Sequence, residues 1–219
     1  MKAILLFGGT FDPIHNGHTA MVTAALAETG AAQTIVLPAG NPYQRDRLPL
    51  ATPQQRTEML AIAFADAPRV AIDRRELARR GPTYTIDTLR ELREAHGDDV
   101  ALIWLIGGDA FARLDTWRQW QSLFTVASFA VVLRQGEVPP ADSMSIALKT
   151  YLADRQIDAA ALGNTPSGKV AILAAVVPPV SSTEIRERVA RGETIRGLAP
   201  DGVCDYIEQH KLYEQPEKD

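Results

Sequence analysis

Cysteine is almost absent from this chain, since Cys204 is the only one among its 219 residues. A lone thiol cannot form an intrachain disulfide, and it has no CxxC partner with which to bind a metal ion. The beginning of the sequence also lacks the apolar core and cleavage site of a secretory leader. We therefore expect a reducing, cytoplasmic compartment, with Cys204 as a small buried residue rather than a nucleophile.

Long apolar runs and excess positive charge are missing as well. No run approaches the ~20 residues that a membrane-spanning helix needs, and the formal net charge is −4. The composition therefore favours neither membrane insertion nor broad binding of nucleic acid through a basic surface. The sequence has no GxSxG, HExxH or zinc-ligand spacing, so it predicts neither a serine hydrolase nor a zinc enzyme.

What the chain does contain is a regular alternation of strand-like and helix-like patterns. Apolar runs predict strands at residues 3–7, 33–37, 70–72, 100–106, 129–133 and 170–177. Capping residues and apolar spacing predict helices over about 16–28, 53–65, 86–96, from 182 onward and over 201–210. This order predicts an α/β fold with a Rossmann-like, doubly wound parallel sheet. We expect a single domain over 1–219, with a small C-terminal helical cap at about 201–213.

The stretch 136–167 has the weakest pattern, and we expect it to pack as a helical excursion. At its end, Gly163–Lys169 spells most of a P-loop, GxxxxGK. A P-loop continues with Ser or Thr and opens a helix, whereas here Val170 begins a strand-like run. The pattern therefore indicates an ordinary loop.

The most informative motif occupies residues 8–18, GGTFDPIHNGH. It follows an apolar strand and ends where a helix is expected to begin, with His15 and His18 on one face of that helix. Free backbone N–H groups and the positive end of the helix dipole would then point at one place, which favours an anion. Two imidazole donors at that place suggest a phosphate that gains charge during a reaction.

This string resembles the signature of the nucleotidyltransferase superfamily with a His-x-Gly-His core, and within it the bacterial nicotinate-nucleotide adenylyltransferases. The resemblance implies that His15 and His18 donate to the phosphates of ATP, with His18 stabilising charge on the α-phosphoryl group. Neither needs to act as a base, because the attacking phosphate is already ionised. The same resemblance implies that ATP is bound by Gly8, Gly9, Thr10 and Phe11.

A second motif lies at residues 180–186, VSSTEIR. Ser181 followed by Glu184 forms a capping box and predicts a helix start directly after the last expected strand. The string also resembles the family's Ser-Ser-Thr-x-Ile-Arg motif, which implies that Ser182, Thr183 and Arg186 hold the ATP phosphates. It further implies that Arg186 is catalytic, because with the two histidines it neutralises the developing charge. Read alone, the serines would only cap the helix and the arginine would be a solvated surface residue.

A third segment, Ile106-Gly107-Gly108-Asp109, ends another expected strand. Glycines there allow a ligand to approach the backbone, and Asp109 could accept a hydrogen bond from a ribose hydroxyl. The alternative is an aspartate that caps the following helix. In the resembling family this segment lies near the nucleotides, which makes Gly107 and Asp109 candidates for ATP binding.

Two further segments concern the acceptor nucleotide. Trp117 resembles the tryptophan that stacks on the pyridine ring in the family, whereas Trp120 is expected in the core. Tyr84 and Thr85 resemble a pair at a helix start that recognises the pyridine carboxylate. A helix N-terminus favours a carboxylate over a neutral amide, and so nicotinate over nicotinamide. Plain capping by Thr83 or Thr85 is the alternative reading of this segment.

Three arginines complete the candidate acceptor residues. Arg45 matches a basic residue that many relatives carry in a loop, although Arg47 is the alternative because the preceding Tyr43-Gln44 departs from the commoner Pro-His. Arg134, directly after an expected strand, resembles another nucleotide-contacting arginine; a solvated charge at a strand end is the other reading.

Taken together, the resemblance implies transfer of AMP from ATP to nicotinate mononucleotide, giving deamido-NAD and pyrophosphate. It implies Mg²⁺ as cofactor, held mainly by the nucleotide and water without a dedicated carboxylate cage. One alternative is a related adenylyl- or cytidylyltransferase with another phosphate acceptor, such as phosphopantetheine. Another is a non-catalytic nucleotide-binding regulator. The sequence leaves the oligomeric state open, a homo-oligomer included.

Overall fold

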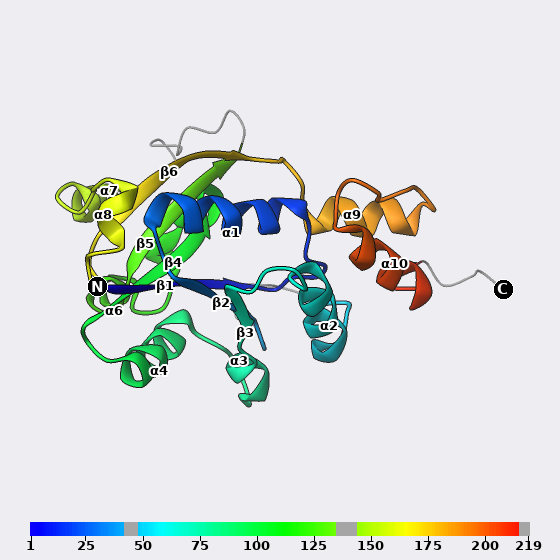
Figure 1. Ribbon diagram of the computed structural model, residues 1–219, viewed down its shortest axis with the longest axis horizontal. Coiled ribbons are helices and arrows are strands. Elements are labelled where there is room, and N and C mark those ends of the chain that lie inside the picture. The colour runs from blue at the N-terminus through cyan, green and yellow to red at the C-terminus, as the bar shows by residue number, and fades with distance from the viewer. Residues whose placement is uncertain (42–47, 135–143, 215–219) are drawn as a thin grey trace.

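The computed structural model describes residues 1–41, 48–134 and 144–214, which form an α/β fold around a parallel sheet (Figure 1). The strands follow the order β3-β2-β1-β4-β5-β6, and every neighbouring pair runs parallel. Their bounds are β1 Lys2–Gly9, β2 Gln33–Pro38, β3 Val70–Ile72, β4 Val100–Gly107, β5 Ser128–Arg134 and β6 Val170–Val177. The predicted doubly wound parallel sheet is confirmed, with strand ends shifted by a residue or two.

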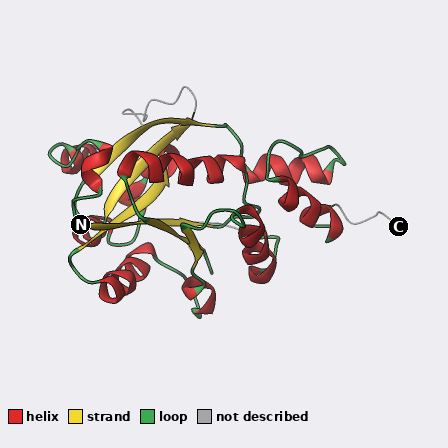
Figure 2. Ribbon diagram, viewed as in Figure 1, coloured by secondary structure: helices red, strands yellow, loops and turns green. Residues whose placement is uncertain are grey.

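Helices cover both faces of this sheet (Figure 2). Their bounds are α1 Asn16–Thr29, α2 Pro53–Ala63, α3 Arg75–Ala78, α4 Thr85–His96, α5 Gly108–Phe111, η1 Leu114–Thr116 (a 3₁₀ turn), α6 Trp120–Val126, α7 Ile146–Leu152, α8 Ala159–Leu162, α9 Ser182–Ala190 and α10 Asp201–Gln209.

Alternate residues of β1 feed two separate cores, which explains its unbroken apolar sequence. Leu5 and Phe7 pack on one face with residues of α1, α2, α9 and α10. Ile4 and Leu6 pack on the other face with residues of α4, α5 and α6. All four side chains are at most 4% exposed.

The helix boundaries follow local signals in the sequence. Thr52 and Gln55 form the reciprocal capping box that opens α2, which is the predicted start. Gly30 ends α1 in the left-handed region, at φ 67°, where glycine carries no Cβ penalty. Helix α2 ends at Ala63, two residues earlier than expected, and Phe64 caps it through its backbone N–H.

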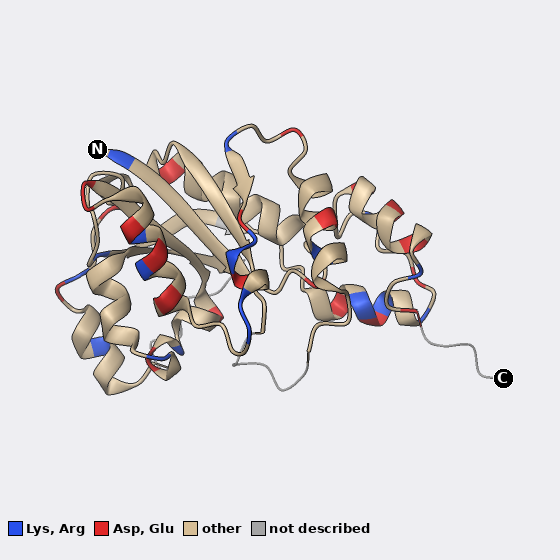
Figure 3. Ribbon diagram, turned by 90° about the horizontal axis from the view of Figure 1, so that it is seen from below, with Lys and Arg blue, Asp and Glu red and all other residues tan. Residues whose placement is uncertain are grey.

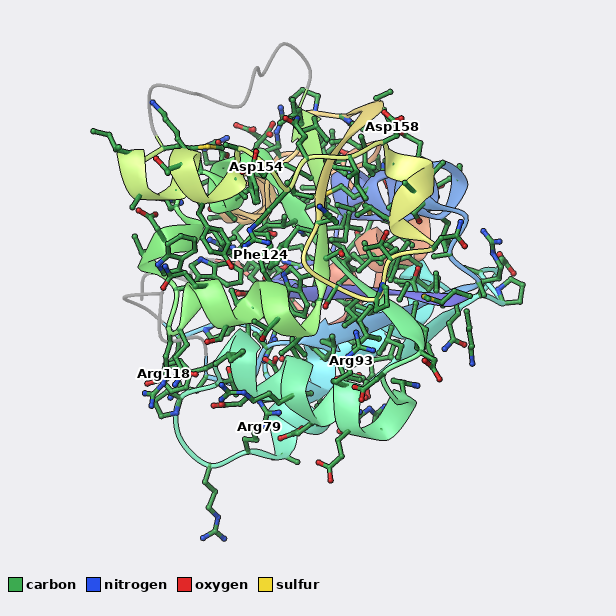
Figure 4. All side chains as sticks on the ribbon, turned by 90° about the vertical axis from the view of Figure 1, so that its left-hand side faces the viewer. Arg79, Arg93, Arg118, Phe124, Asp154 and Asp158 are labelled. Atoms are coloured by element: carbon green, nitrogen blue, oxygen red, sulfur yellow. The ribbon has the colours of Figure 1, made fainter. Side chains whose placement is uncertain are left out.

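Arg93 connects several segments near the amino-terminal ends of the strands (Figure 4). Its guanidinium donates to four backbone carbonyls at 2.7–2.8 Å, those of Gly97, Val100, Val126 and Pro166. These carbonyls belong to the ends of α4 and α6, the start of β4 and the segment before β6. One long side chain therefore satisfies carbonyl groups from four segments that meet there.

Within the described part of the 136–167 stretch, α7 and α8 form the expected helical excursion. Residues 163–169 lie between α8 and β6, so the P-loop-like string is a loop that leads into a strand. The interpretation as an ordinary loop is confirmed. Among the helices of the described ranges, none is both long and apolar enough to cross a membrane.

Strand order reverses at the pair β1 and β4, because β2 and β3 lie on one side and β5 and β6 on the other. Ligands of open parallel sheets bind outside the carboxyl ends of the strands at such a reversal. Helices α9 and α10 lie beyond that end of the sheet (Figure 1). On the surface, acidic and basic residues lie near one another on elements such as α4 (Figure 3). There Nη1 of Arg90 lies 3.9 Å from Oδ1 of Asp87.

Candidate active site

A cleft of about 350 Å³ opens at the carboxyl ends of β1 and β4. Its walls come from the segments after β1, β2, β4 and β6 and from the N-termini of α1, α4 and α9. The predicted site residues that line it are Gly8, Gly9, Thr10, Phe11, His15, His18, Thr85, Gly107, Asp109, Trp117 and Ser182. Three described motif residues, Tyr84, Thr183 and Arg186, lie outside that lining.

The two glycines at the end of β1 are required by packing within the protein. A Cβ on Gly8 would lie 2.5 Å from the ring of Trp104, and a Cβ on Gly9 would lie 2.8 Å from the ring of Phe11. Phe11 itself is 2% exposed and adopts φ 50°, a conformation that bulky residues rarely take. Sequence reasoning missed Trp104, because nothing local links residue 104 to residue 8.

The two histidines are held together at the start of α1. Their rings stack at a centroid distance of 3.6 Å and an angle of 20°. His15 is the N-cap, and its Nδ1 accepts from the backbone N–H of His18 at 3.4 Å. Phe11 meets the His18 ring edge-on at 5.1 Å. His15 therefore caps the helix and lines the cleft at once.

The second motif joins the first directly. The hydroxyl of Ser182 donates to the carbonyl of Pro13 at 2.9 Å, across 169 residues of sequence. Arg186 donates from Nη1 to the carbonyl of Asp12 at 2.7 Å and from Nη2 to Thr183 Oγ1 at 3.2 Å. The N-terminus of α9 is thereby fixed against the loop that follows β1.

Only half of the predicted capping box is present at α9. Ser181 Oγ accepts from the backbone N–H of Glu184 at 3.1 Å, as expected. The carboxylate of Glu184 pairs instead with Arg188 one turn later, at 3.1 Å. An i,i+4 ion pair thus takes the side chain that would have completed the box.

The segment after β4 forms another rim of the cleft. Gly107 is the N-cap of α5, and a Cβ placed there would meet no atom within 4 Å. Asp109 lies exposed in the first turn of α5. Unlike Gly8, Gly107 is not demanded by packing, which leaves open space beside the backbone for a ligand.

The candidate acceptor residues lie at the start of α4 and after η1. Tyr84, rather than Thr83 or Thr85, occupies the N-cap position of α4, and its side chain makes no capping hydrogen bond. Arg118 lies over the ring of Tyr84, 4.6 Å from its centroid. Trp117 is half-buried and lines the cleft together with Thr85.

Trp120 packs edge-on against Tyr151, with ring centroids 4.9 Å apart, but it is half-buried like Trp117 and lies at the margin of the core rather than inside it. Arg45 and Arg47 lie outside the described residues. Arg134 is the last residue of β5, and its side chain is likewise outside what the structure describes.

Glu76 is a cleft residue that sequence reasoning missed. It is 6% exposed and accepts from the hydroxyl of Thr88 at 2.7 Å, which in turn accepts from Arg79 at 2.7 Å. Burial raises the pKa of Glu76, while hydrogen bonds from Thr88 and Thr83 and the charge of Arg79 oppose that shift. The four-residue helix α3 that carries it has no periodicity to read.

Comparisons with known proteins agree with this architecture. The sequence profile described as cytidylyltransferase-like matches residues 6–188. A protein of Chromobacterium violaceum named "Probable nicotinate-nucleotide adenylyltransferase" is 39% identical over 208 residues, covering 95% of this chain and 97% of that protein. A protein of the same name from Laribacter hongkongensis is 40% identical over 215 residues, covering 96% and 94%.

Among solved structures, the nicotinic acid mononucleotide adenylyltransferase of Plasmodium falciparum complexed with NaAD has a TM-score of 0.69 to this chain. The alignment covers 97% of this chain and 98% of that one, at 18% identity. The match shows a shared fold over nearly the whole length.

Proposed function

The chain belongs to the cytidylyltransferase-like family, and on that basis we propose that it transfers the adenylyl group of ATP to nicotinate mononucleotide. The products are deamido-NAD and pyrophosphate. Curated relatives near 40% identity over almost the full length carry the name nicotinate-nucleotide adenylyltransferase, and this chain is an enzyme of that kind. Its substrates are small molecules.

The observation that carries the proposal is the meeting of two motifs at one cleft. The strand β1 delivers the glycine loop and the two histidines, while α9 delivers Ser182 and, behind it, Arg186. The hydrogen bonds from Ser182 to Pro13 and from Arg186 to Asp12 close this junction. Helices α1 and α9 both begin there, and helix N-termini favour the negative charge of phosphates.

The proposed reaction is an in-line attack of the acceptor's phosphate oxygen on the α-phosphorus of ATP. The bond between the α- and β-phosphates breaks, and pyrophosphate leaves with its electron pair. No proton has to be removed from the nucleophile, so His15 and His18 act as hydrogen-bond donors to the charge that develops. Catalysis then rests on alignment and electrostatic stabilisation.

In this proposal Arg186 holds the loop after β1 and also supplies positive charge to the phosphates. It touches the first motif through the carbonyl of Asp12, which leaves its charge close to the phosphate end of the cleft without lining it. Thr10, Gly107 and Asp109 line the cleft and are proposed to bind ATP, as are Gly8, Gly9 and Phe11 through the backbone of their loop. Thr183 supports Arg186 by accepting its second hydrogen bond.

The acceptor is proposed to lie between Trp117 and the start of α4. The indole of Trp117 offers a stacking face for the pyridine ring. The N-terminus of α4 offers backbone N–H groups and a positive dipole end to the carboxylate of nicotinate, which a neutral amide would exploit less. Tyr84 shapes this end of the cleft from outside the lining, and Arg118 packs on its ring.

Mg²⁺ is proposed to arrive with ATP. When bound, it neutralises charge on the phosphate chain and the leaving pyrophosphate. Its ligands would be phosphate oxygens and water, which suits an ion that dehydrates reluctantly. Oxygen-bearing side chains that line the cleft include those of Thr10, Asp109 and Ser182. Within the described ranges there is no group of three or more His, Cys, Asp or Glu side chains placed to hold a metal.

We propose a cytoplasmic location, because a chain with one cysteine can form no intrachain disulfide and so fits a reducing compartment. Cys204 is buried, and burial raises the pKa of its thiol, so it is held in its unreactive form.

The experiment is pyrophosphate release with ATP and Mg²⁺, offering nicotinate mononucleotide, nicotinamide mononucleotide or phosphopantetheine separately. Release with nicotinate mononucleotide well above the other two is the expected result. Release with phosphopantetheine alone would keep the phosphate-end assignments and overturn those of Trp117 and Thr85. Silence with all three acceptors would contradict the proposal and favour a nucleotide-binding regulator.

A further inference from the structure

Asp12 joins three segments of the chain through its carboxylate. Oδ2 accepts from the backbone N–H of Leu50 at 2.9 Å, and Oδ1 accepts from the backbone N–H of Ala51 at 3.0 Å. Oδ1 also accepts from the hydroxyl of Tyr213 at 2.8 Å, across 201 residues. The side chain is enclosed, since Asp12 is only 5% exposed. Three donors therefore fix the direction of this carboxylate.

The backbone of Asp12 is tied to the phosphate end of the cleft. Its carbonyl accepts from Arg186 at 2.7 Å, and its neighbours in sequence are Phe11, which lines the cleft, and Pro13, which receives Ser182. Any rotation of residue 12 would therefore move the guanidinium of Arg186 and the loop after β1 together. The carboxylate connects this backbone to Leu50, Ala51 and Tyr213.

A buried arginine holds the other side of the same junction. Arg56 is 1% exposed and donates to the carbonyls of Thr10 at 2.7 Å and Ala39 at 2.8 Å. Asp12 and Tyr213 are among the groups that act on it electrostatically. Arg56 thus anchors the segment that follows β2 against the loop after β1. Asp12 anchors Leu50 and Ala51 against the same loop.

A tight turn after α10 brings Tyr213 to Asp12. Lys211 and Tyr213 have φ values of 51° and 66°, a region that side-chain-bearing residues rarely adopt. The turn is closed by the N–H of Leu212, which donates to the carbonyl of Ile207 at 3.0 Å. Burial raises the pKa of the Tyr213 hydroxyl, so it stays a hydrogen-bond donor at physiological pH.

We propose that Tyr213 is a positioning residue for ATP, because its hydroxyl orients the carboxylate of Asp12. Asp12 in turn holds Arg186 and residues 50–51 against the loop after β1. The role in ATP binding rests on the function proposed above. Tyr213 lies outside the cleft lining and does not touch the reacting atoms. Its action is through Asp12 alone, and it should leave the acceptor end of the cleft untouched.

The test compares Tyr213→Phe with a matched variant, Tyr206→Phe, in the full chain. Tyr206 lies on α10 and also donates to a carboxylate, that of Glu58, away from the cleft. Tyr213→Phe should raise the dissociation constant for ATP about tenfold, the effect expected when the binding-competent orientation of Asp12 falls to about one tenth of the population. The KM for nicotinate mononucleotide should stay within twofold. Tyr206→Phe should leave both values unchanged.

A second readout does not depend on catalysis. Amide hydrogen exchange of the peptide containing Leu50 and Ala51 should become faster in Tyr213→Phe and stay as in the unmodified protein in Tyr206→Phe. Equal ATP affinity in both variants overturns the proposal, even where exchange differs, because Tyr213 would then only stabilise the fold. Failure of the proposed function would show differently, as absence of dinucleotide product from the unmodified protein while ATP still binds.

Discussion

His18 is the residue on which the proposed chemistry depends most. Its ring lies half-buried at the start of α1, stacked on His15 and bordered by the edge of Phe11. An imidazole that contacts three other rings, those of His15, Phe11 and Phe7, has little freedom to reorient, so its donor can be aimed at one phosphate oxygen without reorganisation during the reaction. Such preorganised donors are the largest single source of rate enhancement in many enzymes.

Replacing His18 by alanine is expected to lower kcat by about 10²–10³-fold, the usual loss when one preorganised donor is removed. The melting temperature should change little, because the side chain is only half-buried and lies at the cleft. Steady-state turnover and thermal unfolding measure the two effects. His210→Ala is the matched control, since His210 is exposed and stacks on Tyr206. Unchanged kcat in His18→Ala would contradict the assignment.

Trp117 and Trp120 separate substrate stacking from packing. Trp117→Ala should raise the KM for nicotinate mononucleotide by about tenfold, since stacking of a base on an aromatic ring contributes ~1–3 kcal/mol, and should leave the KM for ATP unchanged. Trp120→Ala should instead lower the melting temperature, because it loses the edge-on contact with Tyr151. If both variants changed stability alone, Trp117 would be a packing residue too.

Glu76 predicts a pH dependence of folding. Its pKa is raised from 4.5 by burial, so the folded state binds the proton more tightly than the unfolded state. The stability that this group contributes is therefore complete below pH 4.5 and is lost as the pH rises through the folded-state value. Glu76→Gln removes this titration. Relative to the unmodified protein, the free energy of unfolding of the variant should therefore increase as the pH rises above 4.5. Urea unfolding over a pH series measures this, and parallel curves would refute it.

At the scale of elements, the sequence predicts best what is locally encoded. Strand β4 is found at Val100–Gly107 because a strand covered on both faces must be apolar throughout. Helix α2 is found because Thr52 and Gln55 carry its capping box. The short elements α3, α5 and η1 span only three or four residues. They show no periodicity, and tertiary contacts alone determine them.

The glycine pair at the end of β1 can be tested against the glycine at the end of β4. Gly8→Ala would place a Cβ 2.5 Å from the Trp104 ring and should destabilise the fold by ~1–3 kcal/mol, as overpacking does. Gly107→Ala meets no atom within 4 Å and should leave stability unchanged while weakening ATP binding. Chemical denaturation and ATP titration of both variants measure the contrast. Equal loss of stability in the two would show that the loop after β4 is also fixed by packing.

At the scale of the whole molecule, the site is a product of topology. Its two motifs meet although β1 and β6 are not neighbours in the sheet, because the chain after β6 brings the start of α9 back to Pro13. The sequence alone predicts which motifs belong to the site through their resemblance to one family. It cannot predict contacts such as Tyr213 with Asp12 or Trp104 with Gly8, since these depend on long-range packing with no local pattern.

The central claim is that the α-phosphoryl group of ATP is the one transferred. The most direct test supplies nicotinate mononucleotide and Mg²⁺ with ATP labelled either at the α-phosphate or at the γ-phosphate, and separates the products. Adenylyl transfer predicts α-label in a dinucleotide and γ-label in pyrophosphate. Appearance of γ-label in the acceptor product would mean that the cleft transfers the terminal phosphoryl group, and it would contradict the proposed attack on the α-phosphorus.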